Sequence, residues 1–525
     1  MSEPAATTPF TKPHDLLEAA GLPVGAGVVE PHYDPRLANE DLAPLTKQGW
    51  SAYNIFAFWM SDVHSVGGYV TAGSFFALGL AAWQVLLALV IGIVIVFFLA
   101  NLIAKPSQKA GVPYPVISRS VFGVLGANVP AIIRGLIAVA WYGIQTYLAS
   151  ESLIIVALKL WPGLAPLADV HTHGFAGLSA LGYIMYGILW VCQAAVFWTG
   201  MNTIRRFIDW AGPAVYVVML ALAVFLLVQA GGFGRIDWNL NPGLHLSAGT
   251  TVSVFISAIA LTVSYFSGPL LNFGDFARYS TSFGSLRWGN FWGLPVNFLF
   301  FSVLTVVTTA ATVPVFGTMI TDPVATVGRL DSTFAIVLAA LTFTIATIGI
   351  NIVANFVSPA FDFSNISPKR ISWRMGGMIA AVGSVLITPW NLYNNPATIN
   401  YTLNTLGAVI GPLFGVLLAD FYLVHKQRVF VEDLYTMRPS GRYYYRKGFN
   451  PNAIIATAIG AAVGLPIVLI PSWGAVLGDY SWFIGCAVGL VAYWAAERLN
   501  PVVAPTLGEA RPAAEIPVAA ELAID

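Results

Sequence analysis

The chain has 525 residues, of which 57% are hydrophobic and 10% are charged, and its formal net charge is zero. About a quarter of the residues of a soluble protein are charged, so this composition excludes an ordinary soluble domain. A balanced charge also gives no basic surface for nucleic acid. Together with a mean hydropathy of +0.74, these values predict an all-α integral membrane protein.

Apolar runs long enough to cross a bilayer recur along almost the whole chain after residue 50. A span needs about 20 apolar residues, and we find about twelve such runs. The ninth and tenth are the least regular, because Pro389 and the polar run 391–395 interrupt them. The runs lie near 52–79, 82–104, 127–158, 178–200, 211–231, 250–273, 291–316, 333–360, 376–389, 402–424, 452–471 and 478–496.

The segments outside the spans predict two tails. Residues 1–50 are polar, acidic and proline-rich and lack the apolar core of a signal peptide, so we expect a cytoplasmic N-terminal tail. Residues 497–525 are rich in proline and alanine and predict a disordered cytoplasmic C-terminal tail. Cys192 and Cys486 lie within apolar runs, and they predict neither a disulfide framework nor a metal site.

The charges of the connecting loops predict the orientation of the chain. The loops after the second, fourth, sixth, eighth and tenth spans carry about sixteen Lys and Arg residues, and the opposite loops carry about three. Because Lys and Arg are enriched in cytoplasmic loops, we expect both termini in the cytoplasm and a multi-pass protein of the plasma (inner) membrane.

The first and sixth spans each contain a predicted break. Gly67–Gly68 interrupts the first and Gly268–Pro269 the sixth, and both pairs disrupt helices. Interrupted spans at corresponding positions of two halves indicate a transporter binding site. The pattern predicts a 5+5 inverted repeat, residues 51–231 and 250–424, followed by two additional helices in 452–496. The alternative is that these glycines only permit close helix packing.

Two other spans carry polar side chains at membrane depth. Trp141 and Gln145 share one helix face, as do Asn351 and Asn355, because each pair is spaced i, i+4. Such groups are expensive in a bilayer and indicate a functional site. A carboxamide offers a donor and an acceptor, so two can read the N–H and C=O edge of a planar ureide while an aromatic ring stacks on its face. The alternative is that Trp141 packs in the core and Gln145 makes an interhelical hydrogen bond.

Short motifs along residues 38–497 occur in the order found in a known family. They are Asn39-Glu40-Asp41-Leu42, Phe58-Trp59-Met60, Gly111-Val112-Pro113-Tyr114-Pro115-Val116 with Arg119, Trp141-Tyr142-Gly143-Ile144-Gln145-Thr146, Asp275-Phe276-Ala277-Arg278, Asn351 to Asn355 with Ser358-Pro359-Ala360, Asp420-Phe421-Tyr422 and Asp433-Leu434-Tyr435. By these motifs the chain resembles the nucleobase–cation symporter-1 family, which includes bacterial uracil, allantoin, hydantoin and cytosine permeases. The resemblance implies a leucine-transporter-type fold and transport by alternating access.

The resemblance also implies which residues bind the substrate. Two aromatic side chains correspond to residues that stack on it, the second of which is a tryptophan in some members and a phenylalanine here. Carboxamides in the third and eighth spans correspond to groups that read its edge, and a serine of the first span stands near a position that is often Gln or Asn. The implied substrate-binding residues are Trp141, Phe266, Gln145, Asn355, Asn351 and Ser65.

The first and eighth spans predict the coupling ion. In sodium-coupled relatives two adjacent hydroxyls of the eighth span bind the ion, but Gly349 and Ile350 stand at those positions. Only main-chain carbonyls then remain as ligands for a hard cation. Asp62 and His64 are titratable and close to the predicted break, so we expect proton coupling through Asp62, with sodium coupling as the alternative. Capping of exposed backbone is the alternative role of Asp62. The implied ion-coupling residues are Asp62, His64, Ser61 and Ala346.

Further charged groups carry weaker predictions. Asp275 near Arg278, and Asp420 near His425, lie at cytoplasmic span ends and predict structural or gating ion pairs. A histidine pair in an outer loop, at 171 and 173, is too weak a pattern to predict a metal site.

The leading interpretation is a secondary active symporter, not an enzyme, that imports a nucleobase or related cyclic ureide with H+ or Na+ and needs no cofactor. An uncoupled facilitator and a membrane enzyme are the alternatives. The chain has no Gly-x-x-x-x-Gly-Lys-Ser/Thr loop for ATP-driven transport and no cytosolic catalytic domain. We expect a monomer whose partners are the heterocyclic substrate and the lipid bilayer.

Overall fold

The computed structural model describes residue 27 and residues 29–238, 246–392 and 396–502. Within these residues, ten helical segments are long and apolar enough to cross a membrane, which confirms the predicted class. They are α4 (Ala82–Ala110), α7 (Asn128–Leu160), α10 (Ala180–Trp198), α11 (Met201–Gln229), α12 (Ala248–Leu271), α14 to α15 (Phe283–Phe316), α17 to α18 (Thr333–Ile366), α20 (Pro396–Leu418) with η7 (Ala419–Val424), α21 (Pro451–Leu469) and α22 to α23 (Pro471–Leu499). The terminal segments 1–26 and 503–525 of the predicted tails lie outside the described residues.

Two predicted spans are formed differently. The ninth is α19 (Trp373–Leu386), a helix of 14 residues. The first consists of α2 (Ala52–Val63) and α3 (Val66–Ser74), so it is interrupted, as expected, but at residues 64–65 and not at Gly67–Gly68. The cause is a helix cap, because Ser65 Oγ accepts the N–H of Gly68 and starts α3 before the glycines.

The predicted break in the sixth span is wrong. α12 continues through Gly268–Pro269 to Leu271 without interruption. A proline removes one intrahelical hydrogen bond and strains the preceding turn. Here it stands only two residues before the helix end, where few helical bonds remain to be lost.

Three spans instead contain π-helical segments that the sequence did not predict. They are η4 (Trp292–Val296), η5 (Asn351–Phe356) and η7 (Ala419–Val424). A π-helix closes its hydrogen bonds five residues apart and occurs frequently at functional sites. η5 divides the eighth span into α17 (Thr333–Ile350) and α18 (Val357–Ile366), and it contains both predicted asparagines.

The remaining elements are short and connect the spans. Two of them form an antiparallel pair, β1 (Gly174–Phe175) and β2 (Leu178–Ser179). The others are η1 (Phe75–Leu78), α5 (Tyr114–Ile117), α6 (Arg119–Phe122), η2 (Pro162–Leu164), α8 (Ala165–Ala168), α9 (Val170–His173), η3 (Phe233–Arg235), α13 (Gly274–Ala277), α16 (Pro323–Gly328), η6 (Pro389–Asn391), η8 (Glu432–Tyr435) and η9 (Gly478–Tyr480).

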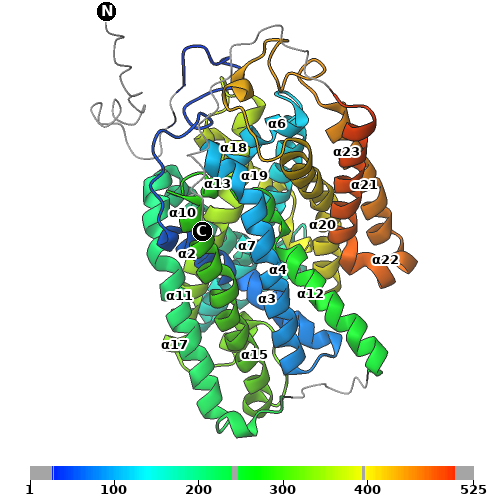
Figure 1. Ribbon diagram of the computed structural model, residues 1–525. Coiled ribbons are helices and arrows are strands. Elements are labelled where there is room, and N and C mark those ends of the chain that lie inside the picture. The colour runs from blue at the N-terminus through cyan, green and yellow to red at the C-terminus, as the bar shows by residue number, and fades with distance from the viewer. Residues whose placement is uncertain (1–26, 28, 239–245, 393–395, 503–525) are drawn as a thin grey trace, which may run out of the picture.

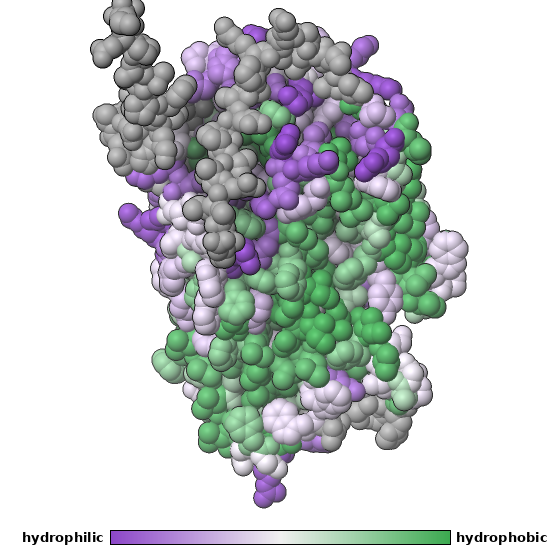
Figure 2. All heavy atoms as spheres, in the orientation of Figure 1, coloured by the Kyte–Doolittle hydropathy of each residue, from purple (hydrophilic) through white to green (hydrophobic). Residues whose placement is uncertain are grey.

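Loops gather at one end of the molecule (Figure 1), where hydrogen bonds connect them. The stretch before α2 crosses this end: Asp34 N–H donates to the Tyr435 carbonyl at 2.8 Å, and Leu45 N–H donates to the Gly111 carbonyl at 3.0 Å. Arg119, fully buried, donates through Nη2 to Asn365 Oδ1 at 2.6 Å. Figure 2 shows hydrophilic side chains gathered at this end, above a broad hydrophobic band over the helices.

Candidate substrate site

The site is built around α7, which presents Trp141 and Gln145 toward α3 and α12. The Trp141 ring meets the Tyr265 ring edge-on, with centroids 5.7 Å apart. Gln145 Oε1 accepts the N–H of Gly67 at 3.3 Å, and Gln145 Nε2 donates to the Tyr265 phenol at 3.3 Å. A Cβ on residue 67 would lie 2.7 Å from Gln145 Nε2, so only glycine lets the carboxamide reach the restarted helix. The structure therefore brings Trp141 and Gln145 directly to the break in the first span.

Tyr265 is a site residue that the sequence reasoning missed. Its hydroxyl lies 3.0 Å from Ser65 Oγ, and the same hydroxyl accepts from Gln145. α3, α7 and α12 thus meet through one phenol. A tyrosine within an apolar span, next to the predicted Phe266, was the signal that could have identified it.

Phe266 lies beside these groups but packs into the core. It is 1% exposed and contacts Trp59 and Phe298 edge-on, with centroid distances of 6.5 and 5.5 Å. Phe266 and Tyr265 both line a small cavity that extends to Gly68. Phe266 thus borders this cavity beside Tyr265, while the rest of its ring packs against Trp59 and Phe298.

The two asparagines of η5 form a relay with α7 and α10. Asn351 Nδ2 donates to Gln193 Oε1 at 2.7 Å and to Thr146 Oγ1 at 3.0 Å. Asn355 Nδ2 donates to Asn351 Oδ1 at 3.0 Å. The Asn351 side chain thus donates through Nδ2 and accepts through Oδ1. The side-chain oxygen of Asn355 takes no part in these bonds and could accept a hydrogen bond from a substrate. Gln193 was missed by the sequence reasoning, although a glutamine within an apolar run is a visible signal.

The predicted ion-coupling residues fall in two environments. His64 is fully paired: Nδ1 lies 2.9 Å from the Tyr69 hydroxyl and Nε2 lies 3.2 Å from Asn297 Oδ1. An Nε2–H tautomer satisfies both contacts with a neutral ring. Ser61 faces α17, where a Cβ on Gly349 would lie 3.5 Å from Ser61 Cβ, and Ala346 is buried in the same helix. The position facing Ser61 therefore carries no side-chain oxygen.

Asp62 is buried at the end of α2. It is 1% exposed, and neither of its carboxylate oxygens has a hydrogen-bond partner among the described residues. Its electrostatic neighbours are Arg134 of α7 and Tyr265. A carboxylate without hydrogen bonds at this depth is costly, which makes Asp62 the exceptional polar group of the break.

The other two predicted carboxylates belong to the polar end. Asp275 Oδ1 accepts the N–H of Tyr114 at 2.8 Å, and burial raises the pKa of this carboxyl to about 7. Asp420 and His425 form an ion pair, with 3.0 Å between Oδ1 and Nδ1. Both contacts tie loops to span ends. His171 and His173 are exposed, and within the described part of the chain no three His, Cys, Asp or Glu residues group to hold a metal.

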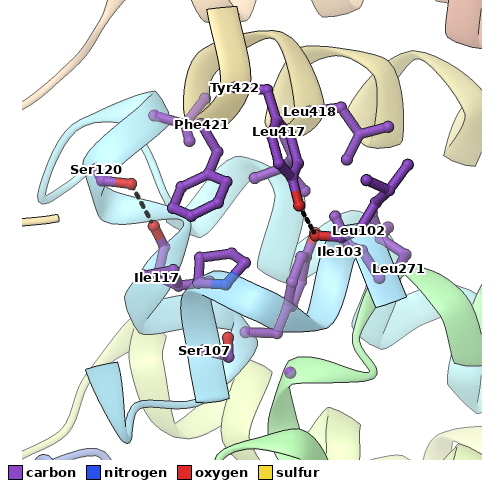
Figure 3. Close-up of a pocket in the computed structure, with 14 residues that line it drawn as sticks. Leu102, Ile103, Ser107, Ile117, Ser120, Leu271, Leu417, Leu418, Phe421 and Tyr422 are labelled. Atoms are coloured by element: carbon purple, nitrogen blue, oxygen red, sulfur yellow. Dashed lines mark hydrogen bonds between the residues drawn. The ribbon is translucent and has the colours of Figure 1, made fainter. Parts of the chain in front are cut away.

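A separate small cavity lies between α4, α5 and η7 (Figure 3). Its lining is mostly aliphatic and aromatic, with Tyr422 donating to the Leu102 carbonyl at 2.9 Å. It contains none of the predicted substrate residues. Because its lining offers few hydrogen-bonding groups to a ureide edge, this cavity is not the candidate site.

Solved structures with the same architecture define the class of protein. The chain superimposes on a nucleobase-cation-symport-1 family transporter, Mhp1, in a closed conformation with bromovinylhydantoin bound, with a TM-score of 0.70, 21% identity, and coverage of 90% of this chain and 95% of that one. A Na+-coupled sialic acid symporter gives a TM-score of 0.59 at 11% identity, over 86% and 90% of the two chains. These likenesses confirm the predicted leucine-transporter-type fold.

Residues 43–485 match the family described as permease for cytosine/purines, uracil, thiamine, allantoin, and the chain belongs to that family. Its relatives include an allantoin permease of Bacillus subtilis, 35% identical over 89% of this chain and 94% of the relative. A purine-uracil permease of Arabidopsis thaliana is 31% identical over 89% of this chain and 79% of the relative. A putative allantoin permease of Escherichia coli is 30% identical over 88% of this chain and 95% of the relative. The protein is therefore a permease for nucleobase-like compounds and not an enzyme, as the resemblance implied.

Proposed function

We propose that this permease is a secondary active symporter that imports a cyclic ureide or nucleobase of the allantoin, uracil or hydantoin type by alternating access. The observation that carries the proposal is the meeting of Trp141, Gln145, Tyr265 and Ser65 at the interrupted first span. The names of the relatives, allantoin and uracil permeases, support the substrate class.

The chemistry of these groups suits a flat, uncharged ring. Trp141 supplies a stacking face, and Gln145 supplies one donor and one acceptor. Gly67 and Tyr265 hold the Gln145 amide in place and use one lone pair of Oε1 and one hydrogen of Nε2, so a second lone pair and a second hydrogen are left for a substrate edge. The Asn355 carbonyl oxygen adds an acceptor from η5. Binding would then draw η5 toward the ring held by α3, α7 and α12, which couples recognition to helix movement.

We propose a proton as the coupling ion and Asp62 as its carrier. Two features support this choice over sodium: Gly349 faces Ser61 without offering an oxygen, and Asp62 is buried with both oxygens unpartnered among the described residues. A neutral, protonated Asp62 is far less costly to bury than an ionised one. His64 is the weaker candidate, because its two nitrogens are already paired in a neutral ring.

The same proposal places the polar end of Figure 2, where the lysine- and arginine-rich loops occur, in the cytoplasm together with both termini. It treats residues 51–231 and 250–424 as two inverted five-helix repeats and α21 to α23 as the additional helices. The functional unit in this proposal is a monomer in the plasma (inner) membrane.

Uptake into proteoliposomes tests the proposal. Radiolabelled allantoin, competed by uracil, hydantoin and cytosine, is measured under an inward proton gradient or an inward sodium gradient at symmetric pH. We expect accumulation with the proton gradient and its loss in Asp62→Asn, whereas Asp331→Asn, which changes an exposed carboxylate, behaves as wild type. Accumulation driven by a sodium gradient alone contradicts proton coupling. Equilibration of the substrate without accumulation under either gradient indicates an uncoupled facilitator.

A further inference from the structure

An arginine is buried near the start of a membrane-spanning helix, on the side of the polar end. Arg134 is 0% exposed and lies in α7, about two helical turns before Trp141. A charged side chain at such depth is costly and marks a functional group by default. Its Nε donates to the Gly268 carbonyl at 3.1 Å, and its Nη2 donates to the Ala354 carbonyl at 3.0 Å. One guanidinium therefore joins the end of α12 to η5.

Both carbonyls lie where the regular helical hydrogen-bond pattern changes. Near the end of α12, the residue whose N–H would normally bond Gly268, Asn272, donates to Leu270 instead. In η5 the bonds run five residues back, since Val357 N–H donates to the Ile352 carbonyl. In that register Ala354 would pair with residue 359, which is a proline and has no N–H. Arg134 donates to both carbonyls, and irregular backbone in a membrane needs such partners.

The charge of Arg134 is shared among several acidic groups. Asp362 of α18 lies next to it, because a Cβ on Gly135 would lie 3.6 Å from Asp362 Cβ. The other electrostatic partners are Asp62 of α2, Asp275 of α13 and Tyr114 of α5. Both oxygens of Asp362 and the Nη1 of Arg134 have no hydrogen-bond partner among the described residues. Asp362 is thus the main partner of the Arg134 charge, while Asp275 also has Arg278 as a positive neighbour.

We propose that Arg134 is a positioning residue of the substrate site, which sets the distance between Tyr265 on α12 and Asn355 on η5 by binding one main-chain carbonyl of each element. One carbonyl belongs to Gly268, three residues after Tyr265. The other belongs to Ala354, one residue before Asn355. The role follows from geometry: a planar guanidinium fixes two acceptors in a way that a lysine ammonium does not. This inference rests on the proposed substrate site.

The test separates this role from simple charge balance. Arg134→Met alone leaves Asp362 uncompensated and is expected to unfold or to be degraded. Arg134→Met with Asp362→Asn removes both charges, and Arg134→Lys keeps the charge. We expect both to reach the membrane, but the double variant should bind allantoin at least tenfold more weakly and Arg134→Lys to an intermediate degree. Arg235→Met, which changes an exposed arginine outside the spans, should match wild type.

A second measurement does not depend on the substrate. Hydrogen exchange should be faster in the double variant for segments 268–273 and 351–358, with α21 unchanged. Wild-type exchange in these segments, or wild-type allantoin affinity in a well-folded Arg134→Lys or double variant, overturns the proposal. If wild-type protein itself binds none of allantoin, uracil and hydantoin, the proposed function fails, and the exchange rates alone decide whether Arg134 positions the two elements.

Discussion

The Nε2 atom of Gln145 lies 3.3 Å from the phenol oxygen of Tyr265, and this contact joins α7 to α12 beside the break in the first span. The same phenol meets Ser65 Oγ at 3.0 Å, so the cap of α3, the carboxamide of α7 and the ring of α12 form one hydrogen-bonded chain. Any movement of α12 relative to α7 must break it. The orientation of Gln145 and the packing of α12 against α7 are therefore coupled through Tyr265.

Removing the Tyr265 hydroxyl tests this coupling. Tyr265→Phe keeps the ring against Trp141 but leaves Gln145 Nε2 and Ser65 Oγ without their partner. Two net hydrogen bonds contribute about 1–2 kcal/mol, so we expect roughly a 5- to 30-fold loss of affinity for radiolabelled allantoin. A scintillation proximity assay on purified protein measures it. Unchanged affinity in a folded variant contradicts the positioning role of the phenol.

Gly67 offers a more selective change. A methyl group at this position would lie 2.7 Å from Gln145 Nε2 and displace the flexible carboxamide, while alanine is the better helix former. Gly67→Ala should therefore keep or raise the melting temperature and weaken allantoin binding at least tenfold. Gly187→Ala in α10, where no atom lies within 4 Å of the added Cβ, is the matched control. Equal affinities in the two variants would show that Gln145 does not read the substrate.

The sequence predicted the spans well, because a bilayer demands long apolar runs whatever the tertiary contacts. It could not decide which of two neighbouring aromatic residues faces Gln145. Successive residues of a helix point about 100° apart, so the choice between Tyr265 and Phe266 depends on the rotation of α12. That rotation is set by packing of Phe266 on Trp59 and Phe298, contacts between residues far apart in the chain.

Local chemistry was also misjudged at two places. The Ser65 cap, and not the flexibility of Gly67–Gly68, decides where the first span restarts. The isolated charge of Arg134 in the third span was visible in the sequence and carried the usual signal of an intramembrane ion. Its targets were not visible, because they are main-chain carbonyls exposed by a helix end and by an unpredicted π-helix.

Trp141 is expected to supply the stacking face. Loss of a stacked aromatic costs about 1–3 kcal/mol per base in nucleic-acid complexes, equivalent to roughly 5- to 150-fold in affinity. Trp141→Ala should lose binding to that extent, and Trp141→Phe should retain part of it. Binding of labelled allantoin to purified, folded variants measures the effect. If the alanine variant binds as wild type does, Trp141 has no part in the site.

The two asparagines of η5 are expected to differ. Asn351 bonds Gln193 and Thr146 across three elements, so Asn351→Leu leaves buried donors and acceptors unpaired and should lower the melting temperature. Among the described residues, the side chain of Asn355 hydrogen-bonds Asn351 alone, so Asn355→Leu should chiefly weaken allantoin binding, by about 1–3 kcal/mol. Thermal unfolding and binding are measured on both variants. If Asn355→Leu chiefly lowers the melting temperature and Asn351→Leu chiefly weakens binding, the proposed roles of the two asparagines are contradicted.

The Asp420–His425 ion pair predicts a pH-dependent stability at the polar end. The carboxylate of Asp420, 3.0 Å away, raises the pKa of His425, while burial of the ring opposes this. A histidine whose pKa is raised by folding contributes stability that is fully present below the unfolded-state pKa and is lost as pH rises through the folded-state pKa. At about pH 6, below the ordinary histidine pKa, the melting temperature of wild type should therefore exceed that of His425→Gln. The difference should shrink as the pH rises through the raised pKa of His425 in the folded protein. Scanning fluorimetry from acidic to alkaline pH in one detergent measures the difference.

A difference that is constant with pH, or that grows toward alkaline pH, shows that His425 is not held protonated by Asp420. Ser332→Ala, at an exposed helix cap far along the chain from this pair, should lower the melting temperature by the same amount at every pH.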